Sequence, residues 1–179
     1  QKNYLRENYY PDMVEIENGY FFQRRAADAL KEFLAAARAQ GFTVSISRTY
    51  MSYPDQRTRF NGMASTIYDR GEMSLADAEK EVAAMGYYPG ADEHQTGLAV
   101  NFVGEDAEAK FSTPVLEWMR EHCAEYGFIL RYPKNAEAVT EITYEPWHWR
   151  YVGVENAAKI NASGLCFEDY IAALQQIAG

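Results

Sequence analysis

The chain has 179 residues, a length that indicates one domain, and 47% of them are hydrophobic, which is enough for a full core. A formal net charge of −9 at pH 7 argues against nucleic acid and anionic membranes as partners, because both repel an acidic protein. No apolar run approaches the roughly 20 residues that a membrane-spanning helix needs, so we expect no transmembrane segment.

The first part of the chain is predicted to hold an extended lead-in, a long helix and a strand. Residues 1–17 are polar and rich in tyrosine, with Pro11 as a breaker. Apolar residues recur at helical spacing over residues 17–40, and Gly41 is placed to end this helix. Residues 42–47 alternate in polarity as a strand does.

Two shorter helices are predicted next, over residues 54–68 and 74–85. Pro54 suits the first turn of a helix, and Ser74 followed by Asp77 is typical of a helix N-terminus. A loop over residues 87–93 follows.

The rest of the chain alternates between short strands and helices. Strands are predicted over residues 96–103, 128–132, 141–144 and 147–152. Helices are predicted over residues 113–127, 154–161 and 167–177. Because the elements are intermixed without βαβ regularity, we expect an α+β fold, in which helices flank a small, mostly antiparallel sheet. We expect one domain over residues 1–179, with residues 1–17 as the lead-in.

Two of the three histidines lie in short runs that also carry glutamates. His94 follows Glu93, and His148 comes three residues after Glu145. A catalytic zinc commonly has three protein ligands and an open position for water, and imidazole suits it well. A glutamate held near that water can act as a general base. The pattern therefore predicts a mononuclear zinc site built from two distant segments.

Other chemistry-bearing residues have ordinary interpretations beside functional ones. His122 lies within a predicted helix and is assigned no chemistry. Cys123 and Cys166 are interpreted as buried thiols, with a disulfide between them as the alternative. The fourteen tyrosines are compatible with a groove for a sugar- or peptide-like ligand and equally with the edge of a core.

Four short runs, in the order in which they occur along the chain, resemble the VanY-type D-alanyl-D-alanine carboxypeptidases. These are zinc peptidases that trim peptidoglycan stem peptides. The most specific runs are Glu93-His94-Gln95-Thr96-Gly97-Leu98-Ala99 and Glu145-Pro146-Trp147-His148-Trp149-Arg150-Tyr151-Val152-Gly153, supported by Tyr50-Met51-Ser52-Tyr53-Pro54-Asp55-Gln56 and Gly127-Phe128-Ile129-Leu130-Arg131-Tyr132-Pro133. The resemblance covers nearly the whole chain. It implies a VanY/hedgehog-like zinc peptidase fold.

The resemblance also implies roles for individual residues. It makes His94 and His148 zinc ligands and Glu145 the catalytic base. The residues that it places along the substrate cleft or its wall are Met51, Ser52, Gln56, Trp147, Trp149 and Arg150. Arg150 is further expected to anchor the final strand.

Two positions depart from the family pattern in ways that bear on activity. The family has an aspartate as third zinc ligand where this chain has Asn101, and an amide oxygen is a poor zinc donor. The family has an arginine, expected to neutralise the substrate carboxylate or the oxyanion, where this chain has Met51. Arg48 lies three residues earlier, and in an extended segment it is expected to face the opposite way.

Smaller departures are Asp92 in place of a usual serine, and Ala136 and Glu141 in place of a common lysine and glycine. We expect Asp92 to pair with His94 or to serve as a replacement carboxylate for the metal.

Two main hypotheses follow. In the first, the chain is a carboxypeptidase-like metallopeptidase domain for peptidoglycan stem peptides, with impaired activity and weakly bound zinc. In the second, it is an inactive homologue that binds cell-wall peptide without hydrolysis and without stable zinc. A sugar-binding module is a third, weaker possibility. Natural drift and deliberate inactivation are both compatible with Asn101 and Met51, as are D,D and L,D specificity.

Both main hypotheses place the protein outside the cytoplasm, in the cell envelope or secreted. No signal peptide is visible, and because the chain begins with Gln1 we expect a processed product whose leader or anchor is gone.

Overall fold

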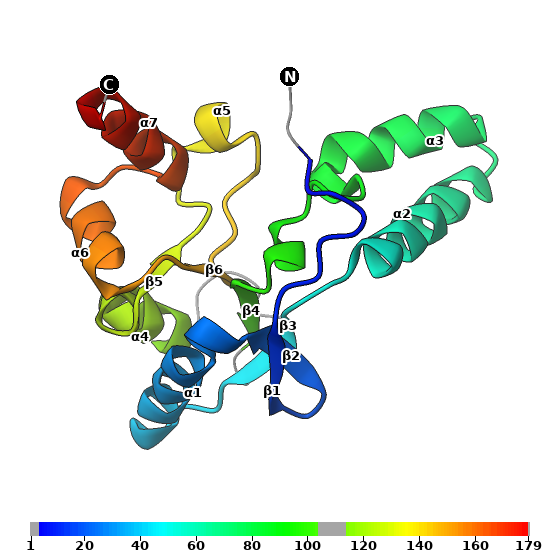
Figure 1. Ribbon diagram of the computed structural model, residues 1–179. Helices are drawn as coiled ribbons and strands as arrows, with labels where there is room; N and C mark the ends of the chain where they lie inside the picture. The colour runs from blue at the N-terminus through cyan, green and yellow to red at the C-terminus, as the bar shows by residue number, and fades with distance from the viewer. Residues whose placement is uncertain (1–3, 104–113, 179) are drawn as a thin grey trace.

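The computed structural model describes residues 4–103 and 114–178 (Figure 1). Its main sheet has four strands in the order β3-β4-β6-β5, and each strand is antiparallel to its neighbours. The four strands are β3 (Ser45–Arg48), β4 (Ala99–Val103), β5 (Phe128–Leu130) and β6 (His148–Tyr151). A separate hairpin pairs β1 (Met13–Glu17) with β2 (Tyr20–Gln23). Helices surround this small antiparallel sheet, so the predicted α+β class is confirmed.

Seven helices of the described chain are arranged around the main sheet (Figure 1). They are α1 (Arg24–Ala39), α2 (Tyr53–Tyr68), α3 (Leu75–Val82), α4 (Pro114–His122), α5 (Glu137–Thr140), α6 (Val154–Ser163) and α7 (Phe167–Ala178). Single turns are η1 (Ala83–Tyr87), η2 (Glu93–Thr96) and η3 (Cys123–Tyr126). The predicted start of α4 at Thr113 lies outside the described residues. Helices α2 and α3 pair and project away from the sheet (Figure 1).

The main core lies between α1 and one face of the sheet. Leu30 and Phe33 of α1 are fully buried against Phe102 of β4 and Trp149 of β6. Burying side chains of this size stabilises a fold by about 1.5–3 kcal/mol each. Two smaller apolar clusters hold α2 against α3 and α6 against β5 and α7. The opposite face of the sheet is therefore available for polar groups.

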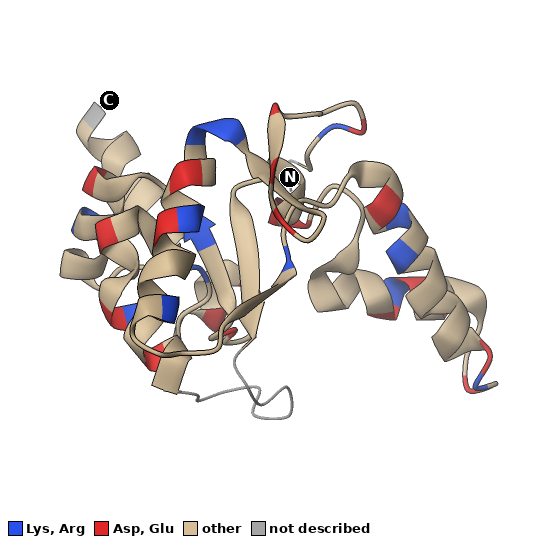
Figure 2. Ribbon diagram, turned by 90° about the horizontal axis from the view of Figure 1, so that it is seen from below, with Lys and Arg blue, Asp and Glu red and all other residues tan. Residues whose placement is uncertain are grey.

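Acidic and basic residues are interspersed along the helices, and most strand residues are neither acidic nor basic (Figure 2). Within the described part of the chain, no helix has the length and apolar character to cross a lipid bilayer. Cys123 and Cys166 are both buried and unbridged, which confirms the interpretation as two buried thiols over the disulfide alternative.

Two predicted elements are wrong. The first helix begins at Arg24 and not at residue 17, because residues 13–23 form the hairpin β1–β2. Its turn is Asn18-Gly19, and both residues have positive φ, as a tight two-residue hairpin turn requires. Residues 141–144 are not a strand: Glu141 has φ 59° and ends the short helix α5 instead.

Candidate active site

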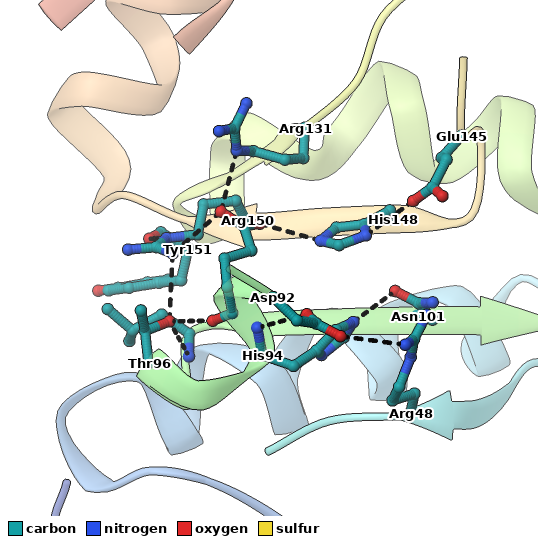
Figure 3. A network of polar contacts seen from close by, with 12 residues as sticks. Arg48, Asp92, His94, Thr96, Asn101, Arg131, Glu145, His148, Arg150 and Tyr151 are labelled. Atoms are coloured by element: carbon teal, nitrogen blue, oxygen red, sulfur yellow. Dashed lines mark hydrogen bonds and ion pairs between the residues drawn. The ribbon is translucent and has the colours of Figure 1, made fainter. Parts of the chain in front are cut away.

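Three residues on neighbouring strands form one row across the sheet. Asn101 of β4 lies opposite His148 of β6 on one side and opposite Arg48 of β3 on the other. Residues directly opposite in paired strands point to the same face, so these three side chains share a face. Val100 and Trp149, next along the same strands, point into the core. The strand register thus brings an amide, an imidazole and a guanidinium together (Figure 3).

His94 reaches this row from the single turn η2. The Asp92 carboxylate caps the turn by accepting the His94 backbone N–H at 3.0 Å, and Gly97 ends it in the left-handed region. The His94 ring is fully buried, with Nε2 3.1 Å from Oδ1 of Asn101. Burial lowers the pKa of His94 to about 3. Its imidazole is therefore neutral at pH 7, which is the form that binds metals.

His148 is held between two carboxylates. Its Nδ1 lies 2.9 Å from Oε2 of Glu145, and its Nε2 lies 2.9 Å from Oε1 of Glu93. Burial by itself lowers the pKa of His148, but the hydrogen bonds to Glu145 and Glu93 outweigh it and hold the pKa above its usual value. The rings of His148 and His94 are 4.9 Å apart between centroids. The two histidines predicted from distant segments therefore lie side by side.

Glu93 connects His148 to two arginines behind it. Its Oε2 accepts from Nε of Arg131 at 3.0 Å and from Nη1 of Arg150 at 3.2 Å. Burial by itself raises the pKa of Glu93, but Arg131, the His148 hydrogen bond and Arg150 together lower it far below its usual range. Glu93 is therefore an anion that fixes the orientation of the His148 ring.

The role of Glu93 was missed from the sequence, although its position beside His94 was visible. Arg131 was missed as well, because its contact with Glu93 joins segments 38 residues apart. Arg150 also donates to Thr96 Oγ1 at 3.1 Å, so it ties β6 to η2, in keeping with the expected anchoring role.

Arg48 does not point away from the site as predicted. β3 ends at Arg48 after an irregularity in its pairing with β4, so simple alternation does not extend from residue 48 to residue 51. Nη1 of Arg48 donates to Oδ2 of Asp92 at 3.3 Å. The expected pairing of Asp92 with His94 is made through the His94 backbone N–H and not through its ring.

The residues expected along the substrate cleft fall into different places. Trp149 is fully buried in the core on the opposite face from His148, so its assignment to the cleft wall is wrong. Gln56 is 3% exposed, and its amide bonds the backbone of Met51, Asp92 and Gly90.

Ser52 caps α2 by accepting the backbone N–H of Asp55. Met51 and Trp147 are half-buried, and the Met51 N–H donates to the carbonyl of His94 at 3.3 Å. Residue 51 therefore lies next to the turn that carries His94.

The donors at this point fit a zinc ion with two strong ligands and one weak ligand. His94 and His148 supply imidazole nitrogens, and Glu93 holds Nε2 of His148 as outer carboxylates hold zinc-bound histidines. Within residues 4–103 and 114–178, no three His, Cys, Asp or Glu side chains form a metal-binding group. A third donor to such an ion would be the neutral Oδ1 of Asn101, which lies 3.1 Å from Nε2 of His94.

A small antiparallel sheet that brings two histidines together, with two glutamates on one of them, is compatible with a metallopeptidase type of domain. Residues 20–154 match the family VanY, D-alanyl-D-alanine carboxypeptidase. The chain belongs to this family, which confirms the resemblance in its sequence.

Two relatives show how far the similarity extends. The chain is 38% identical over 162 residues to YodJ of Bacillus subtilis, covering 88% of this chain and 56% of that protein. It is 32% identical over 171 residues to a D-alanyl-D-alanine carboxypeptidase of Enterococcus faecalis, covering 96% of this chain and 63% of that protein. The chain thus spans less than two thirds of the length of either relative.

Two solved structures share the fold. A vancomycin resistance D,D-pentapeptidase VanY, solved with Zn(II), superposes with a TM-score of 0.81 at 30% identity, covering 96% of this chain and 95% of that one. The LD-carboxypeptidase LdcB gives 0.80 at 35% identity, covering 94% of this chain and 81% of that one. The expected VanY zinc peptidase fold is confirmed.

Proposed function

We propose that the chain is a zinc-dependent carboxypeptidase domain that removes the last residue, D-alanine or a related one, from peptidoglycan stem peptides. The observation that carries this proposal is the meeting of His94, Asn101 and His148 on one face of the sheet, with Glu145 2.9 Å from His148. The names of the similar proteins support the substrate class. Because peptidoglycan lies outside the cytoplasm, we place the action of the domain at the cell envelope.

His94 and His148 would hold the zinc, with Asn101 as a third, weak donor. Bound zinc supplies Lewis acidity and a water whose pKa is lowered toward about 7. Glu93 keeps the His148 ring in place. Glu145, as a carboxylate, accepts a proton from the attacking water and returns it to the leaving amine. The neutral Asn101 and the apolar Met51 are the reason to propose impaired rather than full activity.

The direct test measures release of D-alanine from a pentapeptide stem by the zinc-loaded chain. We expect slow release that falls by roughly 100-fold or more in Glu145→Gln, because the general base is lost. Glu137→Gln, at an exposed position in α5, is the matched control and should leave the rate unchanged. A wild-type rate no higher than that of Glu145→Gln contradicts the proposal.

A second candidate function is peptide binding without hydrolysis. It is favoured by the neutral amide at Asn101 and by the absence of an arginine at Met51. In that case the wild-type chain binds the pentapeptide stem, but D-alanine release stays equal to that of Glu145→Gln even at saturating zinc.

A further inference from the structure

A charged pair, Arg48 and Asp92, lies beside the histidines. Nη1 of Arg48 lies 3.3 Å from Oδ2 of Asp92, and the two side chains are only 20% and 12% exposed. The other oxygen of Asp92 accepts the backbone N–H of His94. Asp92 is therefore attached to the turn that carries His94, and it holds the Arg48 guanidinium next to that turn.

The position of Arg48 suits contact with a bound ligand. It is the direct neighbour of Asn101 across the strands, on the face that also carries His148 (Figure 3). A guanidinium has five N–H donors in a planar fork. Among the described residues, Asp92 is its one ion-pair partner, through Nη1. Donors therefore remain for a second anion on the partly exposed side.

The other two arginines in this network are already committed. Arg131 and Arg150 both contact Glu93, and Arg131 also holds Glu168 through two hydrogen bonds. Through Glu93 they lie on the Nε2 side of His148. Arg48 instead lies beyond Asn101 in the row of side chains that crosses the sheet. Arg48 is thus the cation placed to meet an anion that enters beside His94.

A carboxypeptidase has to distinguish a free chain end from an internal peptide bond, and the distinguishing group is a carboxylate. We propose that Arg48 binds the C-terminal carboxylate of the substrate and that Asp92 orients it for this contact. The inference rests on the proposed function. It assigns the terminal-carboxylate site to a residue of β3, because position 51 carries methionine. Arginine binds carboxylates through paired, charge-assisted hydrogen bonds.

The test compares two peptides that bind to metal-free protein, so that zinc itself cannot attract the carboxylate. The probes are a pentapeptide stem ending in D-Ala-D-Ala and the same peptide ending in a carboxamide, titrated in EDTA by NMR. Asp92→Asn removes the buried anion and keeps Arg48. Arg48→Gln/Asp92→Asn removes both charges, so no unpaired carboxylate is left behind.

We expect wild type to bind the acid at least roughly tenfold more tightly than the amide, as a charge-assisted hydrogen bond implies. Asp92→Asn should show a smaller preference, because Arg48 then lacks the carboxylate that orients it, and a preference equal to that of wild type overturns the role of Asp92. The double variant should lose this preference, and adding Met51→Arg to it should restore the preference. Arg24→Gln removes an exposed arginine that pairs with Asp12, and this control should keep the preference.

Equal binding of acid and amide by wild type, or an unchanged preference in the double variant, overturns the role of Arg48. If the zinc-loaded chain still releases D-alanine in either case, the proposed function stands without it. If wild type, with or without zinc, neither binds nor cleaves the pentapeptide, both the proposed function and the role of Arg48 fail.

Discussion

At the scale of single residues, the amide at Asn101 sets the charge of the candidate metal site. His94 is neutral at pH 7, and an amide oxygen adds no negative charge to it. A divalent cation between His94, His148 and Asn101 would keep its full charge in a buried position, which is unfavourable without an anionic ligand. We therefore expect zinc to bind more weakly here than with aspartate at position 101.

Gly97 is a residue whose backbone conformation places His94. Its φ is +67°, and an added Cβ would lie 2.7 Å from Sδ of Met13. We expect Gly97→Ala to destabilise the fold by about 1–2 kcal/mol, mostly through left-handed strain, since the methionine end can shift. Urea unfolding measures this.

Gly62→Ala is the matched control for that change. Gly62 lies within α2 with no atom near an added Cβ, so the same change there should stabilise the fold by about 0.5–1 kcal/mol. Both changes restrict the unfolded chain equally. The difference between their effects on the free energy of unfolding therefore reports the strain at Gly97 in the native state. A Gly97→Ala variant as stable as Gly62→Ala contradicts this explanation.

The proximity of some side chains was predictable from the sequence and that of others was not, for physical reasons. That His94, His148 and Glu145 lie together was predictable, because their motifs are local in sequence. The assignment of Trp149 to the cleft was wrong, although strand alternation with His148 pointed to opposite faces. Arg48 could not be placed, because its position depends on an irregular strand pairing that leaves no local signal.

At the scale of elements, the helices and central strands were largely predictable from periodicity. The hairpin β1–β2 was missed because the apolar spacing of residues 17–23 also fits a helix, although Asn18-Gly19 is a typical hairpin turn. The order of the strands depends on contacts between distant segments, which a single sequence does not show.

Helix α7 reaches the candidate site through Glu168, beyond the residues that match the family. Glu168 accepts from Arg131 at 2.6 and 3.0 Å, and Arg131 in turn holds Glu93. We expect Glu168→Gln to lower the free energy of unfolding by about 1–2 kcal/mol, because Arg131 is mostly buried and Glu168 is a third exposed.

Zinc affinity should fall as well in Glu168→Gln, because Glu93 loses part of its support. Chemical unfolding and competition with a chelator measure the two effects. Glu155→Gln, which removes an exposed pair with Lys159 in α6, should change neither quantity. If Glu168→Gln and Glu155→Gln have the same free energy of unfolding and the same zinc affinity, α7 does not support the site.

At the scale of the whole molecule, we expect the two histidines to favour a stability maximum near neutral pH in the metal-free protein. The folded-state pKa of His148 is raised, so its contribution is complete below its unfolded pKa of about 6.5 and is lost as pH rises through the folded value. The pKa of His94 is lowered to about 3, so its contribution is complete above about 6.5 and is lost as pH falls.

Urea unfolding of metal-free protein between pH 5 and 9 tests this dependence. We expect stability to decline on the alkaline side in wild type and to decline less in His148→Gln, which cannot titrate there. A wild-type stability that rises steadily from pH 6.5 to pH 9 would contradict the assigned direction for His148.

The most direct test of the central claim, that His94, His148 and Asn101 meet around one weakly held zinc ion, is a zinc titration against a competing chelator. We predict one zinc per chain, bound at least roughly tenfold more tightly by Asn101→Asp and at least roughly tenfold more weakly by His148→Gln. Equal zinc affinity in wild type and His148→Gln, or no gain in Asn101→Asp, would contradict the account.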